Sequence, residues 1–206
     1  YNNALKIYVS SGKATQVTLR IPGTNYSKVR TTIPNDIIEF SLDPSDGQPY
    51  TKDYSELPQP SQVFKGRGII ITADEPIICY GVTRYQYTSD GYLALPKSSL
   101  GKKYLVSSYS DLGTGWSGQE TYNSFTSIVA AYDNTRVTLR LGGTTETYII
   151  QKNGPNLEVS GNNTSIKTMH RGDVWLIASR GNWGDLSGSV VQASKPVAVI
   201  SGSFCA

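Results

Sequence analysis

Few residues of this 206-residue chain are of a type that performs acid–base or metal chemistry. His170 is the only histidine, so a metal cluster or a nucleophile–base pair built on histidine would depend on it alone. It stands in KTMHRGDVW, just before an expected strand, where solvated turn histidines are common. Paired carboxylates such as Asp111 and Glu120 could hydrolyse a glycosidic bond, but no supporting groups surround them. We therefore expect a non-enzymatic protein without catalytic residues, metal or cofactor.

Two short motifs suggest ligands but are better interpreted as turns. DPSDG, from Asp43 to Gly47, has acidic spacing similar to a calcium loop, yet it lacks the ordered oxygen ligands and the closing glutamate. RGD, from Arg171 to Asp173, matches an integrin-binding tripeptide. A ligand of that kind needs the tip of a mobile loop, whereas Asp173 is expected to begin a strand after a turn at Gly172. Both motifs are therefore expected to be structural.

Two tryptophans are the candidate ligand-binding residues. Trp116 in GTGWSG and Trp183 in RGNWGDLSG lie in polar, glycine-rich segments. An exposed indole there could stack on a sugar ring or on a side chain of a partner protein. The alternative is that each tryptophan plugs the open end of a β-sandwich. Both interpretations stay open.

Asparagine sequons and two cysteines are the candidate sites of covalent modification. Asn25, Asn162 and Asn163 begin N-glycosylation sequons in turn-like surroundings. Cys79 and Cys205 form an even pair, which suits an oxidising compartment. These features are typical of an extracellular protein, secreted or displayed on a surface.

The elements that position these residues are predicted to be short strands. The chain is 38% hydrophobic and 17% charged and contains 20 glycines and 10 prolines, and its apolar residues come in short bursts between turn formers. No segment shows sustained 3.6-residue periodicity. The net charge of +3 is scattered, which does not favour a nucleic acid or an anionic membrane as partner.

Several predicted strands occur twice in the sequence. TQVTLRIPG at Thr15–Gly23 returns as TRVTLRLGG at Thr135–Gly143, and GIIITADEP at Gly68–Pro76 matches GSVVQASKP at Gly188–Pro196, both 120 positions apart. DIIEFSL at Asp36–Leu42 resembles DVWLIAS at Asp173–Ser179, 137 positions apart. We predict an all-β fold of two pseudo-symmetric antiparallel β-sandwich-like halves that arose by internal duplication.

This duplication predicts the domain organisation and the positions of individual strands. Residues 1–86 form the first repeat, residues 87–125 a connecting hairpin and loop, and residues 126–206 the second repeat. Ser89-Asp90-Gly91 is expected to turn the chain, and strands are expected at Tyr92–Leu95, Tyr104–Tyr109 and Glu146–Gln151. PIICYGV and PVAVIS are apolar on both faces, so we expect both to lie in sheet centres.

Three segments also carry a family resemblance. SDGYLALPKSSLGKKYLVSSY, SIVAAYDNTRVTLRLGG and SKPVAVISGSFCA resemble the N-terminal domain of the IgGFc-binding protein family over nearly the whole chain. The resemblance implies a secreted or surface-displayed β-rich module of a large protein, often mucin-like or adhesive. It does not transfer antibody binding, since no residue motif for that activity is visible. It also implies a downstream partner for the cysteine of SGxxCA, so a Cys79–Cys205 bond and an outside partner for Cys205 both stay open.

We therefore expect an extracellular structural or adhesive module of a larger multidomain or filament-forming protein, acting through protein–protein contacts. The alternative is a carbohydrate-binding domain that uses the loop tryptophans. The expected partners are neighbouring domains or subunits, or glycans, and neither nucleic acid nor a membrane. We also expect the chain to be one module of a longer polypeptide, with a neighbour packed against the strand edge near Ile200–Ala206.

Overall fold

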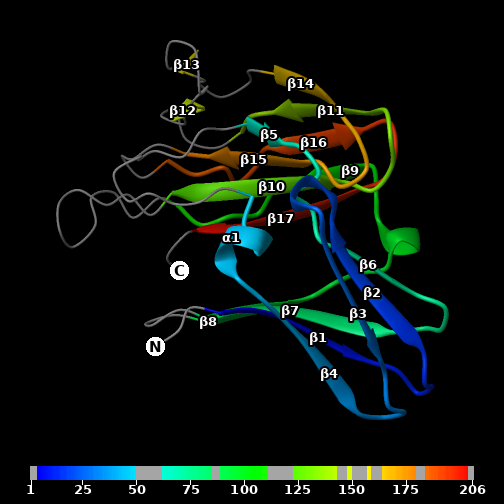
Figure 1. The fold of residues 1–206 in the computed structure, drawn as a ribbon. Coiled ribbons are helices and arrows are strands. Elements are labelled where there is room, and N and C mark those ends of the chain that lie inside the picture. The colour runs from blue at the N-terminus through cyan, green and yellow to red at the C-terminus, as the bar shows by residue number, and fades with distance from the viewer. Residues whose placement is uncertain are drawn as a thin grey trace. The chain divides into compact units, whose positions relative to one another are not determined.

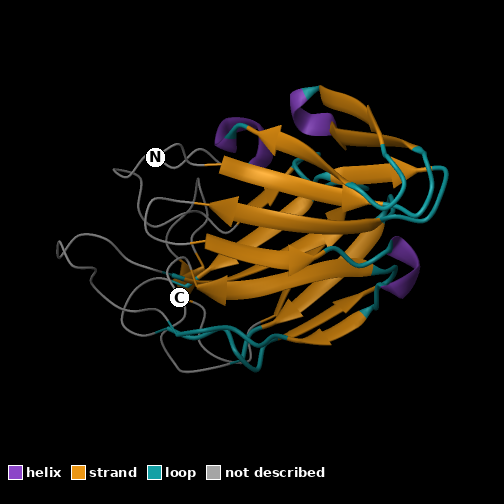
Figure 2. Cartoon of the chain, turned by 90° about the horizontal axis from the view of Figure 1, so that it is seen from below, coloured by secondary structure: helices purple, strands orange, loops and turns teal. Residues whose placement is uncertain are grey.

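The computed structural model describes residues 4–49, 62–84, 89–110, 123–142, 148–149, 157–158, 164–179 and 184–203. Strands dominate these ranges (Figures 1 and 2), and their helical elements are the short turns α1 (Pro44–Gly47), η1 (Pro22–Thr24) and η2 (Lys97–Ser99). No helix within them is long and apolar enough to cross a membrane. The predicted all-β class is confirmed.

The chain divides into two compact units, each made of two separate stretches of sequence. Unit 1 comprises Tyr1–Thr51 and Gly66–Ser99, and unit 2 comprises Lys52–Lys65 and Leu100–Ala206. Residues 52–65 thus belong to the second unit, and the predicted connecting segment 87–125 is shared between the two. The boundaries of the two predicted repeats stay a prediction.

Unit 1 contains two antiparallel sheets with the strand orders β4-β1-β7-β8 and β3-β2-β6. The first consists of β1 (Ala4–Ser10), β4 (Ile37–Leu42), β7 (Ile78–Arg84) and β8 (Ser89–Leu93). The second consists of β2 (Gln16–Ile21), β3 (Tyr26–Thr31) and β6 (Ile70–Ala73). Alternate residues of each strand point inward, and both sheets contribute to one core of Ile7, Val9, Val17, Leu19, Ile21, Phe40, Leu42 and Cys79. Each buried aliphatic side chain contributes about 1.5–3 kcal/mol.

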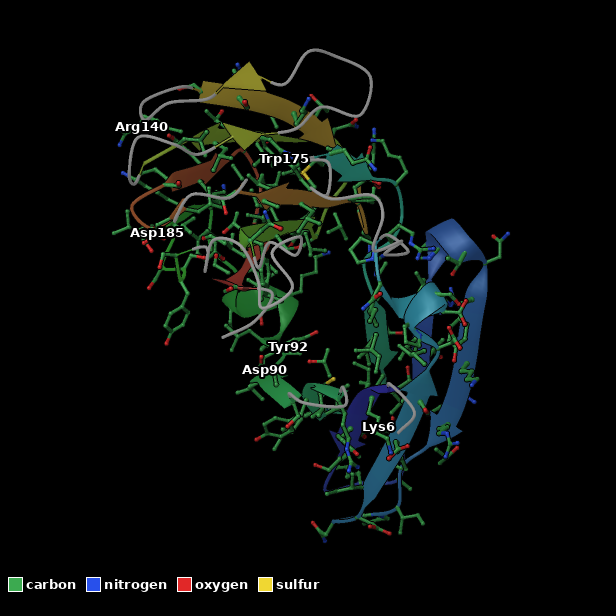
Figure 3. The ribbon with its side chains drawn as sticks, turned by 90° about the vertical axis from the view of Figure 1, so that its left-hand side faces the viewer. Lys6, Asp90, Tyr92, Arg140, Trp175 and Asp185 are labelled. Carbon is green, nitrogen blue, oxygen red and sulfur yellow. The ribbon has the colours of Figure 1, made fainter. Side chains whose placement is uncertain are left out.

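Unit 2 repeats this plan with sheets ordered β17-β10-β15-β5 and β14-β11-β16-β9, and with a small β12-β13 pair. The first sheet consists of β5 (Gln62–Phe64), β10 (Ser124–Ala130), β15 (Val174–Ala178) and β17 (Val197–Ser203). The second consists of β9 (Lys103–Leu105), β11 (Thr135–Arg140), β14 (Thr164–Met169) and β16 (Val190–Ala193). The small pair is β12 (Tyr148–Ile149) and β13 (Leu157–Glu158). Trp175 has the largest side chain in the core of this unit (Figure 3).

The two units pair their strands in the same register. Val17 lies opposite Ala73 in β2 and β6, and Val137 lies opposite Ala193 in β11 and β16, each partner 120 positions later. Val9 stands between Ile38 and Cys79 on β1. Ile128 stands between Trp175 and Val199 on β10. We call residues in matching places topologically equivalent. The agreement is consistent with the duplication inferred from the sequence.

The strand that pairs with β11 lies elsewhere than the sequence predicted. Glu146–Gln151 was expected after β11, but β14 is its partner, and of the predicted segment the structure describes only β12, which pairs with β13. The connection after β11 is longer than the one after β2, so the equivalent of β3 arrives 137 positions later. This is the same separation that relates Asp36 to Asp173.

Ser89-Asp90-Gly91 was wrongly expected to turn the chain, because these residues begin β8. Gly91 lies opposite Val82, and the neighbouring Gly81 lies opposite Tyr92. A Cβ atom on Gly81 would come within 2.6 Å of the Tyr92 ring, so that glycine makes room for a cross-strand aromatic side chain.

Two other strand predictions also need correction. PVAVIS was expected in a sheet centre, yet β17 is the terminal strand among the described strands of its sheet, whereas β7 is internal as predicted. Tyr104–Tyr109 was expected as one strand, but β9 ends at Leu105.

Candidate functional site

The single histidine lies near the surface beside one carboxylate. His170 is 54% exposed, and its Nδ1 lies 3.7 Å from a carboxylate oxygen of Asp133. Among the described residues, no three His, Cys, Asp or Glu side chains gather closely enough to hold a metal ion. Asp111 and Glu120, the carboxylates considered for hydrolysis, lie outside the described ranges.

The RGD tripeptide forms the turn before β15. Gly172 has a φ of 85°, and its topological equivalent Asn35 has a φ of 63°. The Asp173 side chain is only 5% exposed, and its Oδ2 accepts hydrogen bonds from Lys65 Nζ at 2.8 Å and from the His170 backbone N–H at 2.9 Å. The carboxylate that an integrin would need is therefore engaged within unit 2.

The DPSDG segment folds as a capped helical turn. Asp43 is the N-cap of α1, and its Oδ1 accepts a hydrogen bond from the Ser45 backbone N–H at 2.8 Å and another from the Ser45 hydroxyl at 2.6 Å. These bonds lower the pKa of Asp43. The Arg67 guanidinium donates to the carbonyl oxygens of Ser45 and Gln48. These contacts all stabilise the helical turn.

Most of the predicted binding and modification residues fall outside the described part of the chain. Trp116, Trp183, Asn162, Asn163 and Cys205 all lie there. The carbohydrate-binding alternative, glycosylation at the last two sequons and a Cys79–Cys205 bond therefore stay predictions.

The remaining two predicted residues lie in unit 1. Asn25 is exposed in a left-handed conformation between η1 and β3, and its glycosylation stays a prediction. Cys79 is buried in the core and has no disulfide partner among the described residues, and burial raises the pKa of its thiol to about 11.

The outer face of the β4-β1-β7-β8 sheet is the feature that the sequence analysis missed. Cys79 and Gly81 point into the core, so their neighbours along β7 point outward. Five large apolar side chains on this side of the sheet are about half exposed or more: Ile37 (64%), Ile78 (54%), Tyr80 (48%), Leu93 (50%) and Leu95 (60%). We refer to these five residues as the outer face.

Strand pairing brings the outer-face residues together. Ser10 on β1 lies between Ile37 and Ile78, and Tyr80 lies opposite Leu93. The Ala94 N–H donates to the Cys79 carbonyl oxygen at 2.9 Å, which extends the pairing and sets the next residue, Leu95, beside Ile78. Ile78, Tyr80, Leu93 and Leu95 are thus neighbours in one patch, and Ile37 adjoins it across Ser10.

A charged pair borders the patch. Lys6 on β1, labelled in Figure 3, donates from Nζ to Glu39 Oε2 at 2.9 Å. The hydrogen bond that Lys6 donates to Glu39 raises the pKa of Lys6, and the same bond lowers the pKa of Glu39. At one end of the patch the surface forms a shallow hollow, lined by Ser10, Ser11, Gly12, Asn35, Ile37, Pro76, Ile77 and Ile78.

An apolar patch with a polar border has the composition of a protein-binding surface. Its sequence signal was present in PIICYGV, which is apolar on both faces. We interpreted PIICYGV as a strand in a sheet centre. The same pattern also describes a strand with one face in the core and one exposed to a partner.

The comparisons with known proteins agree with the predicted resemblance over part of its extent. A family model described as IgGFc binding protein matches residues 90–206, more than half of the chain. The match covers unit 2 from β9 onward and also β8 of unit 1, whereas the resemblance had been extended over nearly the whole chain. No curated protein and no solved structure matches the chain. By this match the chain belongs to the IgGFc binding protein family.

Proposed function

We propose that this chain is a non-enzymatic structural or adhesive module of a larger extracellular protein, and that it acts through contacts with other proteins. Membership of the IgGFc binding protein family favours an extracellular protein-binding module. The partner that we infer is a neighbouring domain or subunit of the same assembly, such as another copy of this chain in a filament.

The outer face is the single observation that carries this proposal. Apolar side chains scattered singly over a surface need no explanation, whereas a contiguous patch with a polar border is typical of an interface. Tyr80 supplies an aromatic ring near the middle of the patch, and aromatic anchors dominate binding energy at protein interfaces. The Lys6–Glu39 pair at its border would contribute orientation more than affinity.

Sedimentation velocity of the full chain over a range of concentrations tests this proposal. We expect concentration-dependent association that Tyr80→Lys abolishes, because a lysine in the middle of the patch would have to be desolvated on binding. Ile166→Lys is the matched control, since Ile166 on β14 is as exposed as Tyr80, at 48%, but belongs to unit 2. Association that survives Tyr80→Lys, or a chain that stays monomeric at high concentration, would contradict the proposal.

A further inference from the structure

In unit 2, the edge of β16 is covered by a strand from the segment Gly101–Val106. Val190 and Val191 on β16 lie opposite Leu105 and Tyr104 on β9. At one end of this contact the Ala193 N–H donates to Lys102 O at 2.7 Å, and at the other end the Val106 N–H donates to Ser189 O at 2.8 Å. The segment therefore satisfies the backbone groups along this edge.

Two side chains of the same segment close the core of unit 2. Val106 is 3% exposed and belongs to the core cluster, and Tyr104 packs against that cluster. The Tyr104 hydroxyl donates to Val197 O at 2.7 Å and accepts from the Gly101 N–H at 2.6 Å. A Cβ on Gly101 would lie 3.3 Å from this hydroxyl, so glycine suits the position. The segment thus reads Gly-x-x-Tyr-x-Val, with tyrosine and valine facing inward.

Among the described residues, the equivalent edge in unit 1 carries no such strand. β6 is the topological equivalent of β16, and it is the terminal strand of the β3-β2-β6 sheet. The Ala193 N–H points to the added strand in unit 2, and the shared register gives the Ala73 N–H the same direction. The Ile77 N–H, equivalent to the Val197 N–H that donates to Gly101 O, makes no hydrogen bond among the described residues.

Burial along the two edges differs accordingly. Val191 and Val197 in unit 2 are fully buried. Their equivalents in unit 1, Ile71 and Ile77, are only partly buried although they pack against the core. Unit 1 therefore has the sandwich of unit 2 without the strand that closes it.

We propose that the edge formed by β6 and Ile77 is an acceptor site for an extended strand of the Gly-x-x-Tyr-x-Val type from a second polypeptide. The strand adds antiparallel to β6, its backbone bonds the N–H groups of Ala73 and Ile77, and its tyrosine and valine cover Ile71. Addition of a strand to an open sheet edge is an established mode of peptide recognition. The occupant is inferred from the equivalent place in the same molecule, where such a strand is seated.

Charge supports the same occupant. Lys102 and Lys103 follow the glycine of the strand in unit 2, and Lys103 lies opposite Gln192. In unit 1 the residues directly after Ala73 are Asp74 and Glu75, where unit 2 has Ser194 and Lys195. Glu75 already forms an ion pair with Lys13 at 3.0 Å, so Asp74 is the acidic residue that would attract the basic residues of the strand.

A labelled peptide tests the proposal directly. The probe is SLGKKYLVS, the sequence of residues 99–107, added to the full 206-residue chain and followed by fluorescence anisotropy. We expect saturable binding that is about tenfold or more weaker for a peptide with Tyr104→Ala and Val106→Ala, since the inward side chains are lost. Hydrogen exchange of the unmodified chain should slow on peptide addition at the amides of Ala73 and Ile77.

Two variants of the chain locate the site. Ala73→Pro removes the outward N–H, and proline is tolerated on an edge strand whose N–H faces solvent, so this variant should fold but bind the peptide poorly. Tyr80→Lys disables the outer face and should leave peptide binding unchanged, which separates this inference from the proposed function. The inference is overturned by absent binding, by equal binding of the two peptides, or by protection that appears only over Val190–Val197. If Ala73→Pro does not fold, the exchange pattern of the unmodified chain decides.

Discussion

Strands β4 and β15 occupy the same place in the two units but differ in what covers them. Ile37 on β4 is 64% exposed, whereas its equivalent Val174 on β15 is 4% exposed. Glu39 is equivalent to Leu176, which is also buried. β15 is thus buried on both faces, and β4 on one. The pairing ladder fixes which residues share a face, and the surroundings decide whether that face meets water.

The edges of the second sheets repeat this contrast. β16 is closed by β9, whereas no described strand pairs with the outer edge of β6. Unit 1 therefore has two exposed surfaces whose equivalents in unit 2 are covered. One is the outer side of β4, on a sheet face, and the other is the edge of β6. Both proposed binding surfaces therefore lie on unit 1, whereas the more complete core is that of unit 2, and the following predictions test the difference.

The largest expected effect comes from the central strand of unit 2. Trp175→Ala should lower the free energy of unfolding by about 3–5 kcal/mol, because a fully buried indole leaves a cavity. Ile38→Ala at the equivalent place in unit 1 should cost about half of that, since Ile38 is only partly buried. Urea denaturation followed by circular dichroism measures both. Equal losses would remove the distinction between the two cores.

Closure of unit 2 by β9 predicts the next largest effect. Tyr104→Ala should cost about 2–4 kcal/mol, because the ring leaves the core and the Val197 carbonyl loses its donor. Leu105→Ala is the control next to it, and at 73% exposure it should change stability by less than about 0.5 kcal/mol. Tryptophan fluorescence suits this experiment, since all three tryptophans belong to unit 2. A Tyr104→Ala variant as stable as Leu105→Ala would show that β9 does not close the core.

A matched pair of serine substitutions compares the two sheet faces. Val174→Ser should cost about 2–3 kcal/mol, since it removes a buried side chain and buries a hydroxyl. Ile37→Ser should stay within about 0.5 kcal/mol of the natural chain, because the side chain is already exposed to water. Thermal unfolding of both variants under the same conditions checks this. A large loss for Ile37→Ser would mean that the outer face serves stability and not binding.

The smallest effect concerns the thiol in the core of unit 1. Burial raises the pKa of Cys79 from 9.0 to about 11, so iodoacetamide should alkylate it far more slowly in the folded chain than in urea at pH 8. The pKa of the Cys79 thiol is higher in the folded chain than in the unfolded chain. The stability that the protonated thiol contributes is therefore complete below about pH 9 and is lost as the pH rises through about 11. A Cys205→Ser background isolates this thiol. Equal alkylation rates in both states would contradict its burial.

The sequence predicted the strands that carry strong alternation. Val17 and Leu19 in β2, and Val137 and Leu139 in β11, alternate with polar residues, and all four are fully buried. β14 was missed because the connection before it is longer than the one before β3. The separation of 137 seen at Asp173 could have found it, since extending that offset backward aligns KVRTTIPND, residues 28–36, with SIKTMHRGD, residues 165–173.

Other features depend on contacts between segments far apart in the chain. Gln62–Phe64 has no pattern that predicts a strand, and it becomes β5 only by pairing with β15. Gly81 and Gly91 resemble turn residues, yet both lie in paired strands, where Gly81 leaves room for the Tyr92 ring. The exposure of the outer face could not be predicted either. An apolar residue in a strand gives the same sequence pattern whether its side chain is covered by another part of the protein or exposed to water.

Hydrogen exchange of the full chain without any partner tests the central claim most directly. The two sandwiches have the same register but differ in edge closure, so the amides of Ala193 and Val197, bonded to Lys102 and Gly101, should exchange slowly. The equivalent amides of Ala73 and Ile77 should exchange at rates close to those of an open strand edge. Equal protection of the two sets would contradict the account, because it would mean that the edge of unit 1 is already closed.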